Sequence, residues 1–176
     1  MEETKRSMKN AMTYGLYVGL ALVIVHLMQY LMDVYQPSKW VSILTYLIMA
    51  GGIAMGTIYF RNQELNGYIS YGKALGQGIL IGICASIIFG FYFGLLTGVI
   101  DTTYMASLSE VVAEAYLDAG MDYDQVEMMM GMVKKYQTPF LMTISQILGN
   151  TITFIVFSLI TSIFIKKEEP FFDTNE

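Results

Sequence analysis

Long uncharged runs alternate with short polar segments along the chain, and this pattern predicts its helices. Four runs contain no Asp, Glu, Lys or Arg: 11–32, 40–60, 74–100 and 139–165. Each is long enough to cross a bilayer, which needs about 20 apolar residues. Each must also be helical, because lipid offers no water to unpaired backbone groups. The sequence therefore predicts an all-α fold, a bundle of four transmembrane helices.

Residues at the ends of these runs are typical of helix starts. Ser38 follows Pro37 in the turn "DVYQPSKW" and is a predicted N-cap of the second helix. Thr138 is the corresponding N-cap of the fourth helix, with Pro139 at its first position. The first run is too long for the apolar core of a signal peptide and lacks a small-residue cleavage site after Met32, so we interpret it as a retained helix.

Residues 101–138 form the one sizeable segment outside the four runs. Their apolar spacing predicts two short amphipathic helices, one over 104–119 and one starting after Asp122. The segment carries seven acidic residues against two lysines, which we interpret as a solvated acidic face. With this helical insertion between the third and fourth spans, residues 1–176 are predicted to form a single integral membrane domain.

The distribution of Lys and Arg predicts the orientation in the membrane, since these residues are more frequent in cytoplasmic flanks. The two termini and the loop after the second span hold seven of them: Lys5, Arg6, Lys9, Arg61, Lys73, Lys166 and Lys167. The opposite flanks hold three: Lys39, Lys134 and Lys135. We therefore expect both termini in the cytoplasm and 101–138 on the outer face of the membrane.

Composition agrees with a membrane protein. Hydrophobic residues make up 55% of the 176 residues and charged residues 14%, whereas soluble domains average about 25% charged. The mean hydropathy is +0.50. The net charge of -5 leaves no basic surface to neutralise phosphates, so nucleic acid is not an expected partner.

The third run carries a small residue at every fourth position, and we call this stripe the ladder: Ala74, Gly78, Gly82, Ser86, Gly90, Gly94 and Gly98. Small residues at this spacing let helix backbones approach closely and favour right-handed crossings. Four residues turn a helix through about 400°, so each rung shifts by about 40°. We therefore expect the ladder to pack against several neighbours in succession, with Gly90, Gly94 and Gly98 facing a different helix or a second subunit.

Polar residues inside the spans are the other candidates for function. His26 is the single ionisable group there, and such groups often mark ion or proton pathways. Thr143, Gln146, Asn150 and Thr153 share one face of the fourth helix, and Gln77 and Gln29 could meet this stripe. These residues either form hydrogen bonds between helices or line a narrow polar cavity. The predicted cavity set is His26, Gln77, Gln146 and Asn150.

The chain offers no recognisable catalytic or metal-binding constellation. Cys84 lies in an apolar run, where a thiol acts as a small hydrophobe. The acidic insertion lacks the spacing of a calcium-binding loop, and of its clustered methionines Met128 and Met132 share a helix face without a nearby His or Cys to complete a copper site. We predict no catalytic residue, no cofactor and no metal site.

The run "NGYISYGKALGQGILIG", residues 66–82, enters the third span from a short polar loop. With the spacing of the four spans and the long acidic insertion, it resembles a family of small four-helix membrane proteins of Bacteroidota, catalogued as domain of unknown function 4199. The most specific part is "ISYGKAL", Ile69 to Leu75. The resemblance implies a bacterial inner-membrane location and supplies no activity.

Three functions remain open at this point. The first is a non-enzymatic scaffold or accessory subunit that contacts other membrane proteins, or copies of itself, through its helices. The second is a small transporter or permeation unit for a neutral solute, lined by the polar face of the fourth helix and His26. The third is an enzyme acting on lipid or quinone. A polar cavity at these residues, as opposed to a closed dry bundle, would favour the second.

Overall fold

The structure, a computed structural model, describes residues 2–169 and is helical over most of that range. Its elements are α1 Glu2–Leu31, α2 Lys39–Glu64, α3 Tyr71–Leu95, η1 Leu96–Ile100, α4 Tyr104–Asp118, α5 Tyr123–Tyr136 and α6 Pro139–Ile165. The short η1 continues α3 as a wider π-helical turn. The described residues form no β-strand, only an isolated bridge between Ile69 and Lys167. The predicted all-α class is confirmed.

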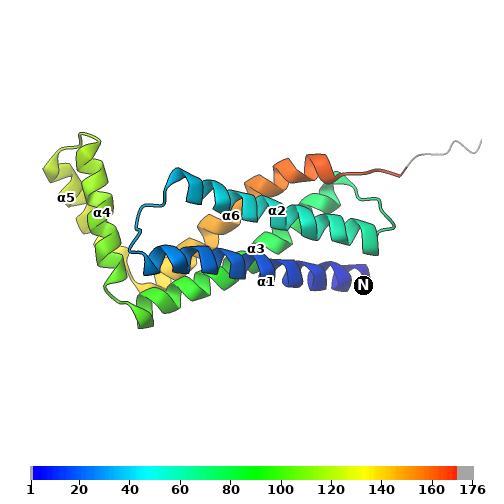
Figure 1. The fold of residues 1–176 in the computed structure, drawn as a ribbon, viewed down its shortest axis with the longest axis horizontal. Coiled ribbons are helices and arrows are strands. Elements are labelled where there is room, and N and C mark those ends of the chain that lie inside the picture. Colours follow the sequence, from blue (N-terminus) through cyan, green and yellow to red (C-terminus); the bar gives the residue numbers. More distant parts are fainter. Residues whose placement is uncertain (1, 170–176) are drawn as a thin grey trace, which may run out of the picture.

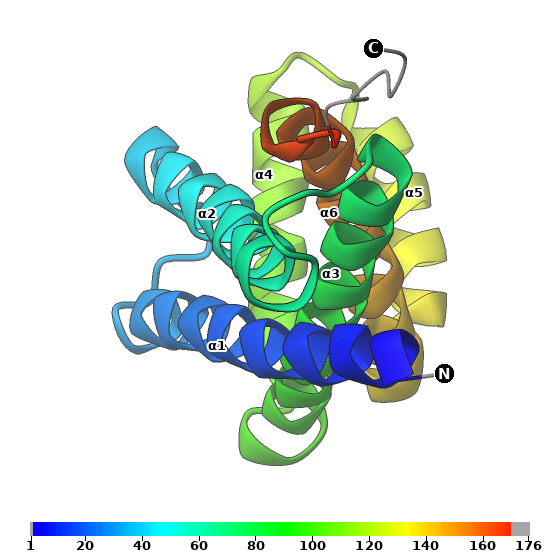
Figure 2. The same cartoon turned by 90° about the vertical axis from the view of Figure 1, so that its right-hand side faces the viewer.

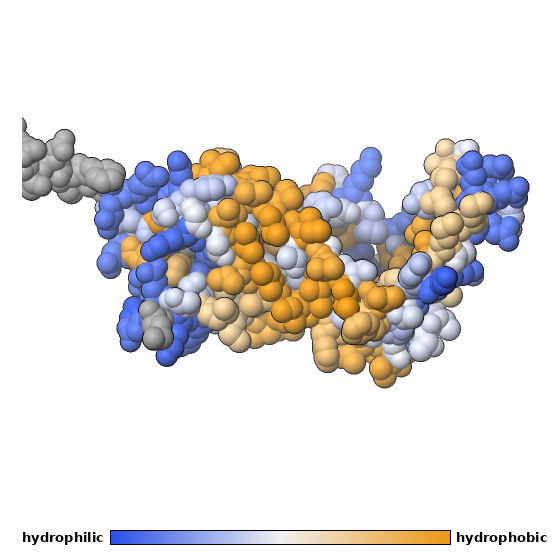
Figure 3. Space-filling view, turned by 180° about the vertical axis from the view of Figure 1, so that it is seen from behind, coloured by the Kyte–Doolittle hydropathy of each residue, from blue (hydrophilic) through white to orange (hydrophobic). Residues whose placement is uncertain are grey.

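Four of the helices are long and apolar enough to cross a membrane: α1, α2, α3 with η1, and α6. On the face that Figure 3 shows, hydrophobic residues cover the middle of the bundle, and polar residues gather at its left end and on the helices that project at the right. The prediction of four candidate spans is thus confirmed, and the chain has the character of a multi-pass integral membrane protein.

The first helix starts well before its apolar run. Residues 2–10 continue α1 as a charged extension. Ion pairs hold this extension on its neighbours: Arg6 pairs with Glu64 of α2 at 3.2 Å, and Lys73 of α3 pairs with Glu3 at 2.6 Å. Polar contacts with α2 and α3 therefore extend the start of α1, and the length of the apolar run alone does not reveal this extension.

The helices pack as a bundle in which α3 is central. Figures 1 and 2 show α3 between α1 and α6, while α2 contacts α1, α3 and α6. The N-terminus and the end of α6 lie at one end of the bundle, here called the termini end. The helices α4 and α5 project from the opposite end, here called the hairpin end.

The middle of the bundle is closed by six buried residues, here called the central apolar layer: Val18, Leu22, Met49, Ile53, Ala85 and Phe154. They come from all four long helices. Polar contacts gather toward the ends instead. At the termini end, for example, the guanidinium of Arg61 donates to the Ile165 carbonyl at 2.9 Å and so caps the last turn of α6.

The ladder faces α6 from Gly78 to Gly98, and this differs from the expected succession of neighbours. The α6 residues that a Cβ at each glycine would meet are Ser158 at Gly78, Phe154 at Gly82, Ile147 at Gly90, Thr143 at Gly94 and Pro139 at Gly98. A single antiparallel partner thus follows the stripe to its end. The outer glycines Gly90, Gly94 and Gly98 face the same helix of the same chain, not a different one.

A second neighbour is present at the first rungs, since a Cβ at Gly78 would also meet Ile53 of α2. The expectation of a new neighbour at the outer glycines was wrong, because it treated the partner helix as straight and counted the drift of α3 alone. The contact positions on α6 also recur mainly at steps of four residues. Both contact stripes therefore turn by about 40° per rung and turn together. Of the remaining rungs, Ser86 is fully buried and Ala74 packs with Phe60, Ile69 and Ile165 at the termini end.

The predicted N-cap residues occupy N-cap positions. Thr138 Oγ1 accepts from the Leu141 amide at 3.3 Å at the start of α6. Ser38 precedes α2 but its side chain makes no capping hydrogen bond. In the insertion, α4 and α5 pack on each other, and α4 also contacts η1.

A candidate binding cavity at the hairpin end

His26 lies on α1 near the hairpin end, between two tyrosines. Its Nδ1 is 3.2 Å from the Tyr92 hydroxyl of α3, and its Nε2 is 3.3 Å from the Tyr104 hydroxyl of α4. In a neutral imidazole one nitrogen donates and the other accepts. One tyrosine therefore donates to His26 and the other accepts from it, and the ring joins three helices.

Aromatic rings surround this histidine. Phe89, Tyr92, Phe93 and Tyr104 each present an edge-on contact, with ring centroids 5.6 to 6.0 Å from that of His26. Such edge-to-face arrangements are favourable by roughly 0.5–1.5 kcal/mol per pair. The cluster fixes the orientation of the imidazole at the base of the α4–α5 hairpin.

Asp101 extends the polar network toward the membrane surface. Its Oδ2 accepts from the Tyr30 hydroxyl at 3.2 Å, and its Oδ1 accepts from the Thr103 hydroxyl at 2.6 Å and from the Tyr104 amide at 3.1 Å. The hydrogen bond from the Thr103 side chain is the main reason that the pKa of Asp101 lies below its usual value. Asp101 thus ties the end of α1 to the start of α4.

A cavity of about 220 Å³ opens beside His26. Its apolar walls are Leu22, Val25, Pro37 and Phe89. Its polar lining comes from α1, α2 and α6: His26, Gln29, Ser42, Thr45, Tyr46 and Asn150. We call it the hairpin-end cavity. Since liquid water occupies about 30 Å³ per molecule, the space matches roughly seven waters and is smaller than the pockets that hold drug-sized ligands.

Three polar side chains of this cavity are free to accept hydrogen bonds, whereas both ring nitrogens of His26 are already engaged by tyrosines. Ser42, Thr45 and Gln29 each donate to a carbonyl of their own helix, at 3.4, 2.9 and 3.3 Å respectively. Their oxygens retain accepting lone pairs. Asn150 differs from these residues, because its buried Nδ2 has no hydrogen-bond partner within residues 2–169. An unpaired buried amide costs about 1–3 kcal/mol, and rotation of this side chain toward an acceptor bound in the cavity would relieve that cost.

Of the four residues expected in a polar cavity, the structure brings His26 and Asn150 together. Gln146 lies one turn before Asn150 on α6 but outside the lining of the hairpin-end cavity. Gln77 lies toward the termini end, where its Oε1 accepts from the Ser7 hydroxyl at 2.6 Å. Thr143 and Thr153 donate to carbonyls of their own helix.

Sequence reasoning did not single out the α2 contribution. Ser42 and Thr45 line the cavity from the first turns of α2, three residues apart on one face. Their spacing was the available signal, but two hydroxyl residues in a transmembrane helix commonly bond to their own backbone. The partnership of His26 with Tyr92 and Tyr104 was likewise not foreseen, since 66 and 78 residues separate the pairs.

Comparison with protein families assigns the chain to one family. The proteins of unknown function grouped as DUF4199 match it over residues 13–167. The chain belongs to this family. No curated protein and no solved structure matches it. Membership of DUF4199 confirms the resemblance carried by residues 66–82 and assigns no activity.

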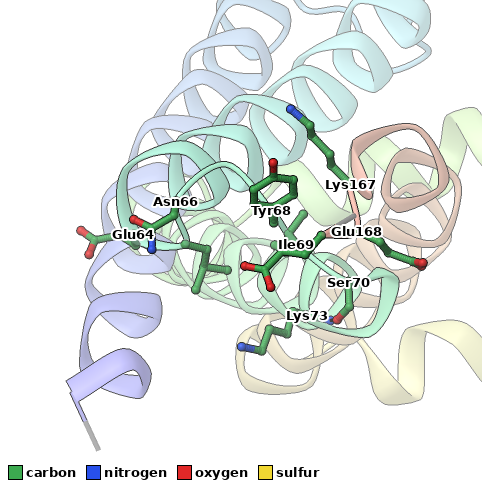
Figure 4. A pocket seen from close by; sticks show the side chains of 10 residues that line it. Glu64, Asn66, Tyr68, Ile69, Ser70, Lys73, Lys167 and Glu168 are labelled. Carbon is green, nitrogen blue, oxygen red and sulfur yellow. The ribbon is translucent and has the colours of Figure 1, made fainter. Parts of the chain in front are cut away.

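In this DUF4199 chain, "ISYGKAL" lies at the termini end, beside an open hollow of about 600 Å³ (Figure 4). Its charged residues have other contacts: Lys73 pairs with Glu3, and the Lys167 ammonium lies 5.3 Å from the centre of the Tyr68 ring. Figure 4 shows the amino groups of Lys73 and Lys167 on different sides of Tyr68. They do not converge on a common ligand position.

A further hollow of about 550 Å³ lies between α1 and α2 at the termini end. Its lining includes Asn10, Tyr14, Tyr17 and Tyr59, with Arg6 and Glu64 at the rim, and we call it the termini-end cleft. Asn10 is 8% exposed and donates through Nδ2 to the Gly56 carbonyl at 2.9 Å. Its Oδ1 is buried and has no partner in the described part of the chain.

Metal binding finds no support in the geometry. Within residues 2–169, no three His, Cys, Asp or Glu side chains are grouped to hold an ion. Of the methionines considered for copper, Met128 and Met132 are both mostly exposed on α5. The hairpin-end cavity is therefore the best-defined candidate site in this structure.

Proposed function

We propose that this protein is a small, non-catalytic membrane protein that binds a small neutral solute in the hairpin-end cavity, as the binding site of a permeation unit. The observation that carries the proposal is the unpartnered amide of Asn150 in a cavity that His26 also lines. A neutral solute with hydrogen-bond acceptors and donors complements this lining, which contains no Asp, Glu, Lys or Arg among the described residues.

The position of the cavity suits this role. It lies within the span region of α1, α2 and α6, close to the end where the hairpin projects. The excess of Lys and Arg at the termini end supports cytoplasmic termini, and the cavity is then in the outer half of a bacterial inner membrane. A solute would enter it from the outer face.

The main argument for the competing scaffold function is weakened. That hypothesis relied on the ladder as a free contact surface, but five of its glycines pack against α6 of the same chain. They are therefore not available to a partner protein. We accordingly place solute binding first.

The test is solute flux through purified protein in sealed liposomes, with glycerol and urea as neutral probes in a light-scattering assay. We expect faster entry than in empty liposomes. Asn150→Leu removes the free amide and should reduce the entry rate. Gln146→Leu is the matched control, since it is an equally polar residue one turn away that does not line the cavity. Equal rates with and without protein, or equal loss in both variants, would contradict the proposal.

A scaffold or accessory-subunit role is the second candidate, and the α4–α5 hairpin favours it. Six acidic residues of the hairpin are exposed: Glu110, Glu114, Asp118, Asp122, Asp124 and Glu127. This charge fits a membrane protein with a basic outer surface. Crosslinking in native membranes tests it: charge reversal at Glu110 and Glu114 should weaken a crosslinked product, and recovery of isolated monomers alone would argue against the role.

A further inference from the structure

Two polar hollows lie along the α1–α2 interface, one toward each end of the bundle. His26 of α1 and Thr45 of α2 line the hairpin-end cavity. Tyr14 of α1 and Tyr59 of α2 line the termini-end cleft. The same pair of helices therefore borders a polar space on each side of the bundle centre.

Between these spaces the interface is apolar and closed. Val18 packs directly on Gly52, leaving no room there for even a Cβ. Leu22 and Met49 are 4% and 2% exposed and belong to the same central apolar layer. Tyr17 still lines the termini-end cleft and Leu22 already lines the hairpin-end cavity. Four residues lie between them, and the two positions are about 8 Å apart along the helix.

Each space also contains a buried polar atom without a partner. Asn10 Oδ1 is in the wall of the termini-end cleft, and Asn150 Nδ2 is in the wall of the hairpin-end cavity; neither has a partner among residues 2–169. Orphaned polar atoms at protein surfaces facing a hollow are usually satisfied by water or a ligand. The lining of each space therefore includes a polar group that water or a solute would satisfy after a small movement of the side chain.

We propose that the α1–α2 interface is the path of the solute, and that Val18, Leu22, Met49 and Gly52 form its closed gate. This inference rests on the proposed permeation function and adds the route. Hydrophobic constrictions of this kind exclude water and thereby stop polar solutes. Opening requires α2 to move away from α1.

The packing of the bundle suits such a movement. The ladder holds α3 against α6, and Gly15 and Gly19 hold α1 closely against α3 at Cys84 and Ile88. Contacts of α2 with its three neighbours are less extensive than those of α3 with α1 and α6. The helix that must move, α2, is therefore the one with the least extensive contacts.

Thiol labelling tests the closure without knowledge of the solute. In a Cys84→Ala background, single cysteines are placed at Thr45, Asn10 and Val18, and sealed vesicles receive a membrane-impermeant maleimide on one face at a time. We expect Thr45→Cys to react from one face, Asn10→Cys from the other, and Val18→Cys from neither. Leu44→Cys is the matched control, because Leu44 neighbours Thr45 but is 49% exposed toward the lipid side and lines neither space.

Two labelling results would overturn the gate. One is reaction of Val18→Cys as fast as Thr45→Cys, and the other is reaction of Thr45→Cys and Asn10→Cys from the same face. Protection of Thr45→Cys to the level of Leu44→Cys would show that no water reaches the hairpin-end cavity and would contradict the proposed function as well.

Flux measurements separate the gate from the binding site. Val18→Ala shortens the side chain that fills the contact with Gly52 and should raise glycerol entry several-fold. Val23→Ala makes the same change on the same helix at a residue that lines neither space, and should leave the rate unchanged. If Asn150→Leu lowers flux while Val18→Ala behaves like Val23→Ala, the gate is wrong and the binding site stands. If the wild-type protein conducts neither probe, the proposed function itself fails.

Discussion

The α3–α6 and α1–α2 interfaces use glycine in different ways. Along α3, glycines recur from Gly78 to Gly98 and each faces a side chain of α6, so the contact is continuous over the length of the span. Along α2, Gly52 faces Val18 of α1, and Gly56 faces both Tyr14 of α1 and Ile81 of α3. Polar hollows flank this short contact on both sides. The long stripe of glycines joins α3 to α6 over the whole span, whereas the short stripe on α2 closes one point between the two polar hollows.

The difference has an energetic basis. Helices in lipid associate mainly through van der Waals packing, and small residues increase that packing by bringing backbones together. The α3–α6 interface gains it at every turn, and even Ser158 contributes there by its small size next to Gly78. The α1–α2 interface gains it over about two turns only. The first interface should therefore be the more sensitive to added volume.

The largest effect is expected from Gly82→Ala in the α3–α6 interface. The new methyl group would collide with the buried Phe154 side chain, and overpacking of this kind costs about 1–3 kcal/mol. Thermal denaturation in mild detergent measures the loss. Gly76→Ala and Gly149→Ala are matched controls, because a Cβ at either position meets nothing within 4 Å. Both controls should be neutral or slightly stabilising, and equal losses in all three variants would refute the account of the interface.

A smaller loss is expected from Gly52→Ala in the α1–α2 interface. Its methyl group meets Val18, so the cost should be about 1–2 kcal/mol and should fall when Val18→Ala is combined with it. Residues in direct contact show such coupling in double-mutant cycles. Additive losses in the double variant, measured by the same denaturation, would mean that Gly52 acts through another contact.

Replacement by leucine should change the free energy of unfolding in opposite directions at Asn150 and Asn10. Asn150→Leu removes a buried amide that lacks a partner for its nitrogen, so the free energy of unfolding should stay constant or rise by about 1 kcal/mol. Asn10→Leu removes the hydrogen bond to Gly56 at 2.9 Å and should lower that free energy by a similar amount. Destabilisation of equal size in both would indicate that Asn150 has a structural partner.

The smallest effect is expected at Asp101, which links the end of α1 to the start of the hairpin. Its pKa is lowered, first by the Thr103 hydroxyl, so the ionised carboxylate stabilises the fold at pH values above the unfolded pKa of about 3.9. This contribution is lost as the pH falls toward the lowered folded value. The difference in melting temperature between wild type and Asp101→Asn should therefore shrink below about pH 4. A difference independent of pH would exclude the charge as its cause.

The sequence was informative about spans and much less about contacts. Absence of charge over some 20 residues identifies a spanning helix directly, which is why the four runs correspond to α1, α2, α3 with η1, and α6. The charged start of α1 escaped this criterion, because it depends on ion pairs of Glu3 and Arg6 with residues of other helices. Such pairings are set by the arrangement of the helices, which a single sequence does not contain.

The candidate site illustrates the same limit. His26 and Asn150 were identifiable as polar residues in apolar runs, and so were Gln77 and Gln146. Which of them meet depends on the height and rotation of each helix: Asn150 reaches the level of His26, whereas Gln77 lies at the level of Ser7. The pairs Gly15 with Gly19 and Gly52 with Gly56 carried the same four-residue spacing as the ladder, but their shortness made them inconspicuous.

The meeting of Gly98 and Pro139 has a consequence for how this chain can vary. A Cβ at Gly98 would lie 3.1 Å from Pro139, so the polypeptide leaves the bundle and re-enters it at nearly the same point. A segment inserted between such neighbouring points imposes no geometric demand on the four helices. The hairpin can thus change in length or charge, provided that Asp101 keeps its contact with Tyr30 and the 5% exposed Tyr104 keeps its contact with His26.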